Sequence, residues 1–251
     1  MEVTLDSIRD IKLYQSKNGY RFSVDALLLY SFVHMPLAQK IADLGAGSGI
    51  IGLLLAKKYP SADVSLFEIQ DRLATVAEKN IVLNSLGKSV KVIQGDIREI
   101  SAVTRPSADA GSFDMVVSNP PFRKERSGFV NPEEERAVAR HEIKLKLPEL
   151  VKASHYLLKT KGRFFLIHHP GRLAELVSAL REKRMEVKRL RFVHSSASSE
   201  AKMVLVEALH GGRVGLKVER PLYIYDENGG YTEEMLVMYG IQRKEPPRGQ
   251  R

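Results

Sequence analysis

The sequence predicts an α/β fold: a seven-stranded, mostly parallel sheet with helices on both faces, an antiparallel last strand and a small carboxyl-terminal hairpin. Two observations lead to this prediction. Short β-type runs alternate with segments of helical periodicity, which is the pattern of parallel strands joined by crossover helices. The last two β-type runs are separated by only a short polar interval, mostly serine. That interval is too short for a helical crossover, so it favours an antiparallel pair.

Seven β-type runs supply the strands. They are short and apolar, and most are rich in β-branched or aromatic residues, as strands in a buried sheet are. They cover residues 40–44, 63–67, 90–94, 113–117, 163–168, 187–193 and 202–208.

Four segments between these runs predict helices. The segment 50–59 is rich in leucine, and the segment 71–86 places Leu73, Val76, Ala77 and Ile81 on one face at helical spacing. Two later helices are expected at 142–158 and 172–183.

The chain of 251 residues is expected to form a single domain over 1–251. Its core covers 37–210, with a segment 1–36 before it and an appendage 211–251 after it. Within that appendage, residues 222–225 and Tyr231 predict a hairpin around a turn that contains Gly229 and Gly230. A basic tail follows.

Composition excludes several classes of protein. The chain has no cysteine, which removes disulfides, thiolate metal sites and cysteine nucleophiles. No apolar stretch approaches the roughly 20 residues that span a bilayer, and the first residues carry charges, so we expect a cytoplasmic protein without a membrane partner. No spacing of ligands predicts a metal. The net charge of +9 favours a polyanionic partner such as nucleic acid.

A glycine-rich turn follows the first predicted strand. Residues 45–49 read Gly-Ala-Gly-Ser-Gly, and glycines allow a ligand to come within contact distance of backbone N–H groups. A dinucleotide fingerprint needs a further glycine three positions after Gly47, where this chain has Ile50. The departure disfavours a nicotinamide or flavin cofactor, which brings a pyrophosphate. It favours S-adenosylmethionine, which brings an amino-acid group.

Three acidic residues stand at the ends of the first three strands. Asp43 precedes the glycines, where a carboxylate repels pyrophosphate but can hold an ammonium group directly or through water. Glu68 can bind both ribose hydroxyls, and Asp96 can accept a hydrogen bond from the adenine amino group. Together they predict an adenosine site at the carboxyl edge of the sheet.

The tetrapeptide Asn-Pro-Pro-Phe follows the fourth strand, and its prolines end that strand and hold the asparagine extended. An amine on an aromatic ring is a weak nucleophile because its lone pair is delocalised. Donation of its two N–H groups to the Asn119 side-chain oxygen and the Pro120 carbonyl aims that lone pair at a methyl donor. Phe122 offers a flat face for stacking. The expected catalytic residues are Asn119, Pro120, Pro121 and Phe122.

Three further segments, residues 15–29, 119–142 and 221–232, make a resemblance specific. With the motifs above, the chain resembles the class I methyltransferases that carry an Asn-Pro-Pro-[Phe/Tyr] motif on a Rossmann-like sheet. Within them it resembles the bacterial valine-tRNA adenine-N6 methyltransferases. The resemblance implies transfer of a methyl group from S-adenosylmethionine to adenine N6 of tRNA, beside the anticodon of valine tRNA.

The resemblance also implies which residues meet each ligand. The segment 1–36 is expected to cover the cofactor. Expected substrate contacts are Arg123, Lys124, Arg140 and His141. Expected cofactor contacts are Gln15, Arg21, Phe22, Asp43, Gly45, Ala46, Gly47, Gly49, Glu68, Ile69, Asp96 and Ile97.

Two alternatives stay open at this stage. The same tetrapeptide geometry suits a planar carboxamide nitrogen, so methylation of glutamine N5 in a peptide release factor is one. That family is expected to carry a helical domain before its core, and few residues precede Asp43 here. A non-catalytic RNA-binding module is the other.

Overall fold

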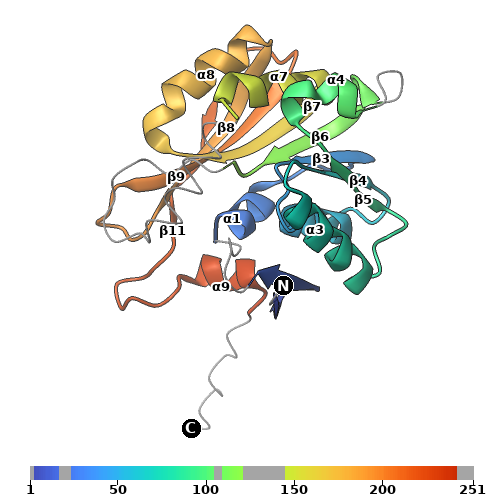
Figure 1. Cartoon of the computed structure of the whole chain (residues 1–251). Coiled ribbons are helices and arrows are strands. Elements are labelled where there is room, and N and C mark those ends of the chain that lie inside the picture. Colours follow the sequence, from blue (N-terminus) through green and yellow to red (C-terminus); the bar gives the residue numbers. More distant parts are fainter. Residues whose placement is uncertain (1–2, 17–23, 105–108, 121–144, 242–251) are drawn as a thin grey trace.

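The computed structural model describes residues 3–16, 24–104, 109–120 and 145–241. Over these residues the chain forms a two-stranded hairpin and a nine-stranded sheet (Figure 1). In chain order the elements are β1 (Val3–Ile8), β2 (Ile11–Ser16), α1 (Val24–Phe32), β3 (Lys40–Leu44), α2 (Ile50–Lys58), β4 (Asp63–Glu68), α3 (Asp71–Leu83), β5 (Val90–Gln94), the 3-10 helix η1 (Ile97–Glu99), α4 (Ile100–Val103), β6 (Phe113–Ser118), α7 (Leu147–Leu157), β7 (Leu158–His168), the 3-10 helix η2 (Pro170–Arg172), α8 (Leu173–Glu182), β8 (Met185–His194), β9 (Ala201–His210), β10 (Lys217–Val218), β11 (Leu222–Tyr223) and α9 (Glu233–Tyr239).

All seven predicted strands form, and the strand order is β10-β8-β9-β7-β6-β3-β4-β5, with β11 also paired to β8. Neighbouring strands from β5 through β7 are parallel, while β9 runs antiparallel to both β7 and β8. The prediction of a mostly parallel sheet with an antiparallel last strand is confirmed. The strand count differs because two short strands, β10 and β11, add to the edge at β8.

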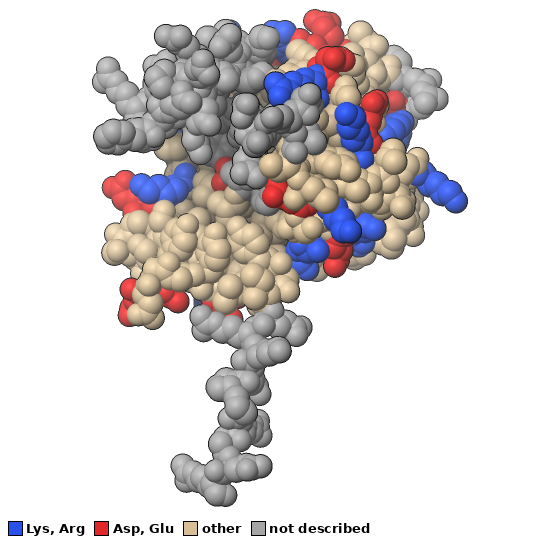
Figure 2. All heavy atoms as spheres, turned by 60° about the horizontal axis from the view of Figure 1, so that its bottom comes forward, with Lys and Arg blue, Asp and Glu red and all other residues tan. Residues whose placement is uncertain are grey.

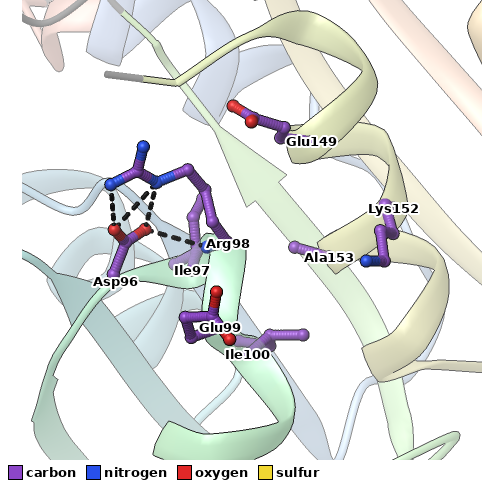
Figure 3. Close-up of a pocket in the computed structure, with 8 residues that line it drawn as sticks. All are labelled: Asp96, Ile97, Arg98, Glu99, Ile100, Glu149, Lys152 and Ala153. Carbon is purple, nitrogen blue, oxygen red and sulfur yellow. Dashed lines mark hydrogen bonds and ion pairs between the residues drawn. The ribbon is translucent and has the colours of Figure 1, made fainter.

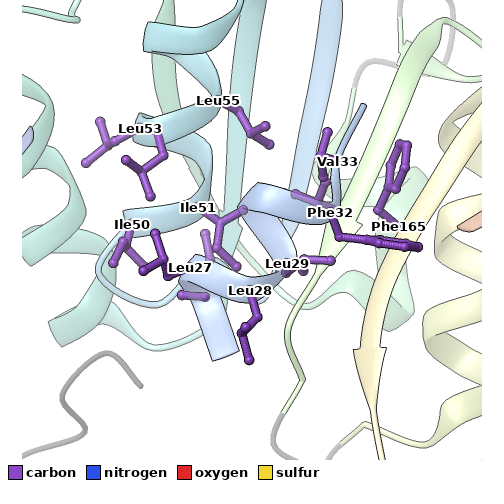
Figure 4. Packing of buried hydrophobic residues seen from close by; sticks show 14 of the residues in the cluster. Leu27, Leu28, Leu29, Phe32, Val33, Ile50, Ile51, Leu53, Leu55 and Phe165 are labelled. Atoms are coloured by element: carbon purple, nitrogen blue, oxygen red, sulfur yellow. The ribbon is translucent and has the colours of Figure 1, made fainter. Parts of the chain in front are cut away.

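Helices cover both faces of the sheet. In Figure 1, α4, α7 and α8 lie above it, while α1, α3, α9 and the amino-terminal hairpin lie below. Two hydrophobic cores result, and Figure 4 shows the lower one, in which α1 packs against α2 and β7. There Phe32 of α1 meets Phe165 of β7 edge to face, with ring centroids 6.3 Å apart. The helix α1 is therefore clamped between α2 and the sheet.

The predicted helices form with small differences at their ends. The segments 50–59 and 71–86 become α2 and α3, and 172–183 becomes α8 preceded by η2. Helix α7 starts at Leu147, and residues 142–144 of its predicted range lie outside the described residues.

Besides β10 and β11, the elements additional to the predicted ones include the hairpin of β1 and β2, helix α1, the short helices η1 and α4, and helix α9. Helix α1 is apolar nearly all round, so it carries no amphipathic period that would identify it. Helix α9 begins at the Thr232 cap and ends at Gly240, whose φ is +78°.

The predicted carboxyl-terminal hairpin is reduced to one bridge, between Tyr225 and Tyr231. On either side of the bridge the Asp226 N–H donates to the Gly230 carbonyl at 2.8 Å and the Thr232 N–H to the Ile224 carbonyl at 3.1 Å. The chain before the hairpin pairs with β8 as β11, and the chain after it coils into α9. Among the described residues, no helix is both long and apolar enough to cross a bilayer.

Candidate active site

Four adjacent strands end at one edge of the sheet and bring the predicted site residues together. Their order is β5-β4-β3-β6, and the register pairs Asp43 with Val117 on β6 and Glu68 with Gln94 on β5. The hydroxyl of Ser118 donates to the Leu44 carbonyl at 2.8 Å and joins the ends of β6 and β3. Because neighbouring strands lie about 4.8 Å apart, the four ends fall within about 15 Å of one another.

The glycine-rich turn after β3 has the conformation that glycine permits. Gly45, Gly47 and Gly49 have φ values of +73°, +59° and +87°. The N–H groups of Gly45 and Ala46 both donate to the Phe67 carbonyl, at 2.9 and 3.0 Å, which fixes the turn to β4. A Cβ added to Gly45 or Gly47 would meet nothing within 4 Å. Open space therefore lies beside these two glycines.

Gly49 serves packing instead. It precedes α2 as its cap, and a Cβ there would lie 3.0 Å from the Leu66 side chain.

Asp43 lies beneath the turn rather than in the open space. Asp43 is only 1% exposed, and its Oδ2 accepts a hydrogen bond from the Gly52 N–H at 2.9 Å. Burial raises the pKa of Asp43 to about 7, and the nearby Glu68 charge acts in the same direction. This geometry suits a residue that supports the start of α2 and acts on a ligand through the turn.

Glu68 holds the turn from the neighbouring strand. Its Oε2 accepts from the Gly47 N–H at 2.9 Å, and its Oε1 accepts from the Gln70 N–H at 2.9 Å. A carboxylate has about four acceptor positions, so two remain for hydroxyl donors. Ile69, the next residue, is exposed at the same strand end and offers an apolar surface.

Asp96 and Ile97 begin η1 after β5 and line a cavity of about 500 Å³ between η1, α4 and α7 (Figure 3). Both carboxylate oxygens of Asp96 accept from the Arg98 guanidinium, and Oδ1 also accepts from the Arg98 N–H at 2.9 Å. Glu149 and Lys152 of α7 face the cavity from the other side. The volume lies in the range of small-molecule sites.

Asn119 and Pro120 follow β6 directly and are half-buried at the same edge. Gln15 lies buried in β2, where its Nε2 donates to Asp6 at 2.8 Å. The remaining predicted site residues lie outside the described residues: Arg21, Phe22, Pro121, Phe122, Arg123, Lys124, Arg140 and His141.

Asn80 is a functional candidate that sequence reasoning missed. It is fully buried in α3, where its Oδ1 accepts from the Tyr14 N–H at 2.6 Å and its Nδ2 donates to the Ser48 carbonyl at 2.9 Å. It thus links the amino-terminal hairpin to the glycine-rich turn. The available signal was its position three residues after Ala77, on the apolar face of that helix, because a buried amide needs partners.

His168 is a second such residue. It ends β7, and the register Ser118–Leu166 places it level with Pro120. Burial lowers the pKa of His168 to about 4, so the imidazole is neutral near pH 7.

Among the described residues, no group of three or more His, Cys, Asp or Glu side chains could hold a metal ion.

Similarity to known proteins covers most of the chain. The family model described as the methyltransferase small domain matches residues 23–189. A tRNA1(Val) (adenine(37)-N6)-methyltransferase of Porphyromonas gingivalis is 31% identical over 82% of this chain and 81% of that protein. A relative of the same name from a Shewanella species is 29% identical over 87% of this chain and 90% of that protein.

Solved structures share the fold. A predicted O-methyltransferase of Agrobacterium tumefaciens superposes with a TM-score of 0.68 at 23% identity, over 86% of this chain and 95% of that one. The TYW2 protein of M. jannaschii, solved in complex with AdoMet, gives 0.56 at 15% identity, over 82% of this chain and 85% of that one.

Proposed function

Because the chain belongs to the methyltransferase small domain family, we propose that it transfers a methyl group from S-adenosylmethionine to N6 of adenine in tRNA. The position proposed is the adenine beside the anticodon of valine tRNA, since relatives covering most of the chain carry that activity in their names. The observation that carries the proposal is the position of Asn119. It follows the end of β6, level with the start of the glycine-rich turn that follows β3, the neighbouring strand in the sheet. Since the proposed substrate is tRNA, we also propose that the protein acts in the cytoplasm.

The edge of the sheet fits the proposed cofactor in shape and in chemistry. Open space beside Gly45 and Gly47 leaves room for its amino-acid portion against backbone N–H groups. Glu68 keeps acceptor positions for two ribose hydroxyls, and Asp96 with Ile97 would face the adenine. When bound, S-adenosylmethionine supplies an electrophilic methyl group on a sulfonium.

Asn119 and Pro120 act on the amine that receives the methyl group. The Asn119 side-chain oxygen and the Pro120 carbonyl accept hydrogen bonds from its two N–H groups. These hydrogen bonds turn the nitrogen lone pair out of conjugation with the ring. The nitrogen loses a proton to water after methylation, so the site needs no strong base. Phe122 is proposed to stack on the base.

The test separates this proposal from methylation of a glutamine side chain. The protein is incubated with labelled S-adenosylmethionine and, in parallel, unmodified total tRNA or a peptide release factor. Label in tRNA supports the proposal. Label in the release factor alone would replace adenine N6 with glutamine N5 as the acceptor.

A further inference from the structure

Three tyrosine rings form a ladder in the carboxyl-terminal appendage. The rings of Tyr225 and Tyr231 stack with centroids 5.5 Å apart and planes 10° apart, and Tyr231 meets Tyr239 of α9 at 5.2 Å. Tyr225 remains 42% exposed and Tyr231 36% exposed. The ladder therefore ends in flat aromatic surface that no described part of the protein covers fully.

Backbone and side-chain hydrogen bonds hold this surface in place. The Tyr225 N–H donates to the Ser195 carbonyl at 2.8 Å, and the Asp226 carboxylate accepts from the N–H groups of Asn228 and Gly230 at 2.9 and 3.0 Å. The Thr232 hydroxyl donates to the Tyr223 carbonyl at 2.8 Å. A ligand that stacks here would order few additional groups on binding.

The ion pair between Arg191 and Glu234 fixes the helix at the far end of the ladder. Arg191 of β8 donates twice to the Glu234 carboxylate, at 2.6 and 2.7 Å, and so fastens α9 to the sheet. Such bidentate pairs are geometrically specific.

The ladder lies at the same edge of the sheet as Asn119. Strand β11 runs parallel to β8 and pairs with its last residues, Val193 and His194. Since β8 and β7 are both antiparallel to β9, β8 points the same way as β7 and β6. Four strand spacings, about 19 Å, separate β6 from β11 along this edge. An RNA loop that places one base at Asn119 can thus present another base to the tyrosines.

The charges beside the ladder favour contact with a base rather than with phosphates. Exposed Glu227 lies within the turn and exposed Glu233 begins α9, and both would repel a phosphate held close to the turn. Figure 2 brings forward the lower face of Figure 1, and a broad part of that face is free of charged side chains, with both basic and acidic side chains at its margins. Aromatic side chains bind unpaired RNA bases by stacking, which needs no charge.

We propose that Tyr225 and Tyr231 form a stacking platform for a second unpaired base of the RNA substrate, at a distance from the base that is methylated. The proposal rests on the proposed function for its choice of RNA. It adds a second point of contact, which helps to set which loop is accepted.

Steady-state kinetics test the platform with matched variants. Tyr225→Leu removes the ring and keeps an apolar side chain, and it should raise KM for tRNA on the order of 5- to 150-fold, the range of one lost base stack. Its kcat at saturating tRNA and its affinity for S-adenosylhomocysteine should stay unchanged. Tyr225→Phe keeps the ring and should behave as wild type. An unchanged KM in Tyr225→Leu, or an equal loss in Tyr225→Phe, would overturn the proposal.

Fluorescence gives a readout that does not depend on methylation. The chain has no tryptophan, so Tyr225→Trp places a single probe on the platform. An RNA hairpin with an unpaired loop should quench it, whereas Val82→Trp, at a residue 77% exposed on α3, should respond weakly. Quenching at position 225 without methylation of any RNA would retain the platform and reject the proposed function. Methylation of tRNA without quenching at position 225 would retain the proposed function and reject the platform.

Discussion

The Glu68 carboxylate accepts a hydrogen bond from the Gly47 N–H at 2.9 Å, across from β4 to the glycine-rich turn after β3. One acidic side chain, which is only 4% exposed, therefore shapes the turn from the neighbouring strand. The second oxygen, held by the Gln70 N–H, keeps the carboxylate from rotating. We propose that this fixed carboxylate accepts hydrogen bonds from the ribose hydroxyls of the cofactor.

Removing that carboxylate should weaken cofactor binding sharply. In Glu68→Ala two charge-assisted hydrogen bonds to the ribose are lost, at about 1.5 kcal/mol each, so affinity for S-adenosylhomocysteine should fall by about 3 kcal/mol. Calorimetry measures this directly. Glu78→Ala, at an exposed position of α3, removes a charge of the same sign as a control. Equal affinities in wild type and Glu68→Ala would remove Glu68 from the cofactor site.

The raised pKa of Asp43 gives a pH dependence with a definite sign. The folded pKa of about 7 lies above the ordinary value of 3.8, so the folded protein holds the proton more tightly. The contribution of Asp43 to stability is thus present below pH 4 and is lost as the pH rises towards 7. Asp43→Asn keeps an acceptor for Gly52 and cannot ionise. Its free energy of unfolding relative to wild type should rise by a few kcal/mol between pH 5 and pH 8, at about 1.4 kcal/mol per pKa unit.

The stability of Asp43→Asn has to be compared with that of wild type at each pH, because His168 changes the stability with pH in the opposite direction. Its pKa of about 4 lies below the ordinary 6.5, so its contribution to stability is lost as the pH falls from 6.5 towards 4. That term is common to wild type and Asp43→Asn and cancels in the difference. Urea unfolding at each pH supplies the values, and a difference that does not change with pH would refute the burial of an acid at position 43.

Two glycines near the turn should fail in different ways. In Gly47→Ala the new methyl group enters open space, so the expected loss is mainly of cofactor affinity, with a strain of about 1 kcal/mol from the positive φ. In Gly52→Ala the Cβ would overlap the Leu66 side chain, so the expected loss is about 1–3 kcal/mol of stability. Thermal unfolding and cofactor calorimetry on both variants separate the effects. A loss of stability in Gly47→Ala together with a loss of cofactor affinity in Gly52→Ala would place the cofactor elsewhere.

Affinity for tRNA should fall steeply with salt, because lysine and arginine displace counterions from phosphates. The double variant Arg123→Ala/Lys124→Ala should bind tRNA more weakly and with a shallower salt slope. Lys57→Ala/Lys88→Ala removes two exposed charges near the opposite, amino edge of the sheet and serves as the control. Equal slopes in the two double variants would assign the phosphate contacts to another surface.

The sequence patterns were enough to predict the regularly alternating strands and helices of the sheet. The strand that ends at Leu44 and the strand that ends at Gln94 have the bounds read from the sequence, because buried parallel strands are short apolar runs between polar ones. The placement of Glu68 and Asp96 at one edge followed from the parallel order alone. Strand direction fixes which ends meet.

Side-chain direction and long-range contacts could not be obtained in this way. The sequence placed Asp43 at the edge but did not indicate that it turns inward to Gly52, since both orientations satisfy the pattern. The contact of Asn80 with Tyr14 and Ser48 joins segments far apart in the chain. Helix α9 offered its Thr232 and Gly240 signals over too short a length for helical periodicity to appear.

The most direct test of the account measures N6-methyladenosine in valine tRNA. Unmodified tRNA is incubated with S-adenosylmethionine and either wild type or Asn119→Ala, then digested to nucleosides and analysed by mass spectrometry. Wild type should form N6-methyladenosine beside the anticodon. Asn119→Ala should be about 100- to 1000-fold slower, the cost of losing one preorganised hydrogen-bonding group, with cofactor binding retained. Full activity in Asn119→Ala, or no N6-methyladenosine from wild type, would contradict the account.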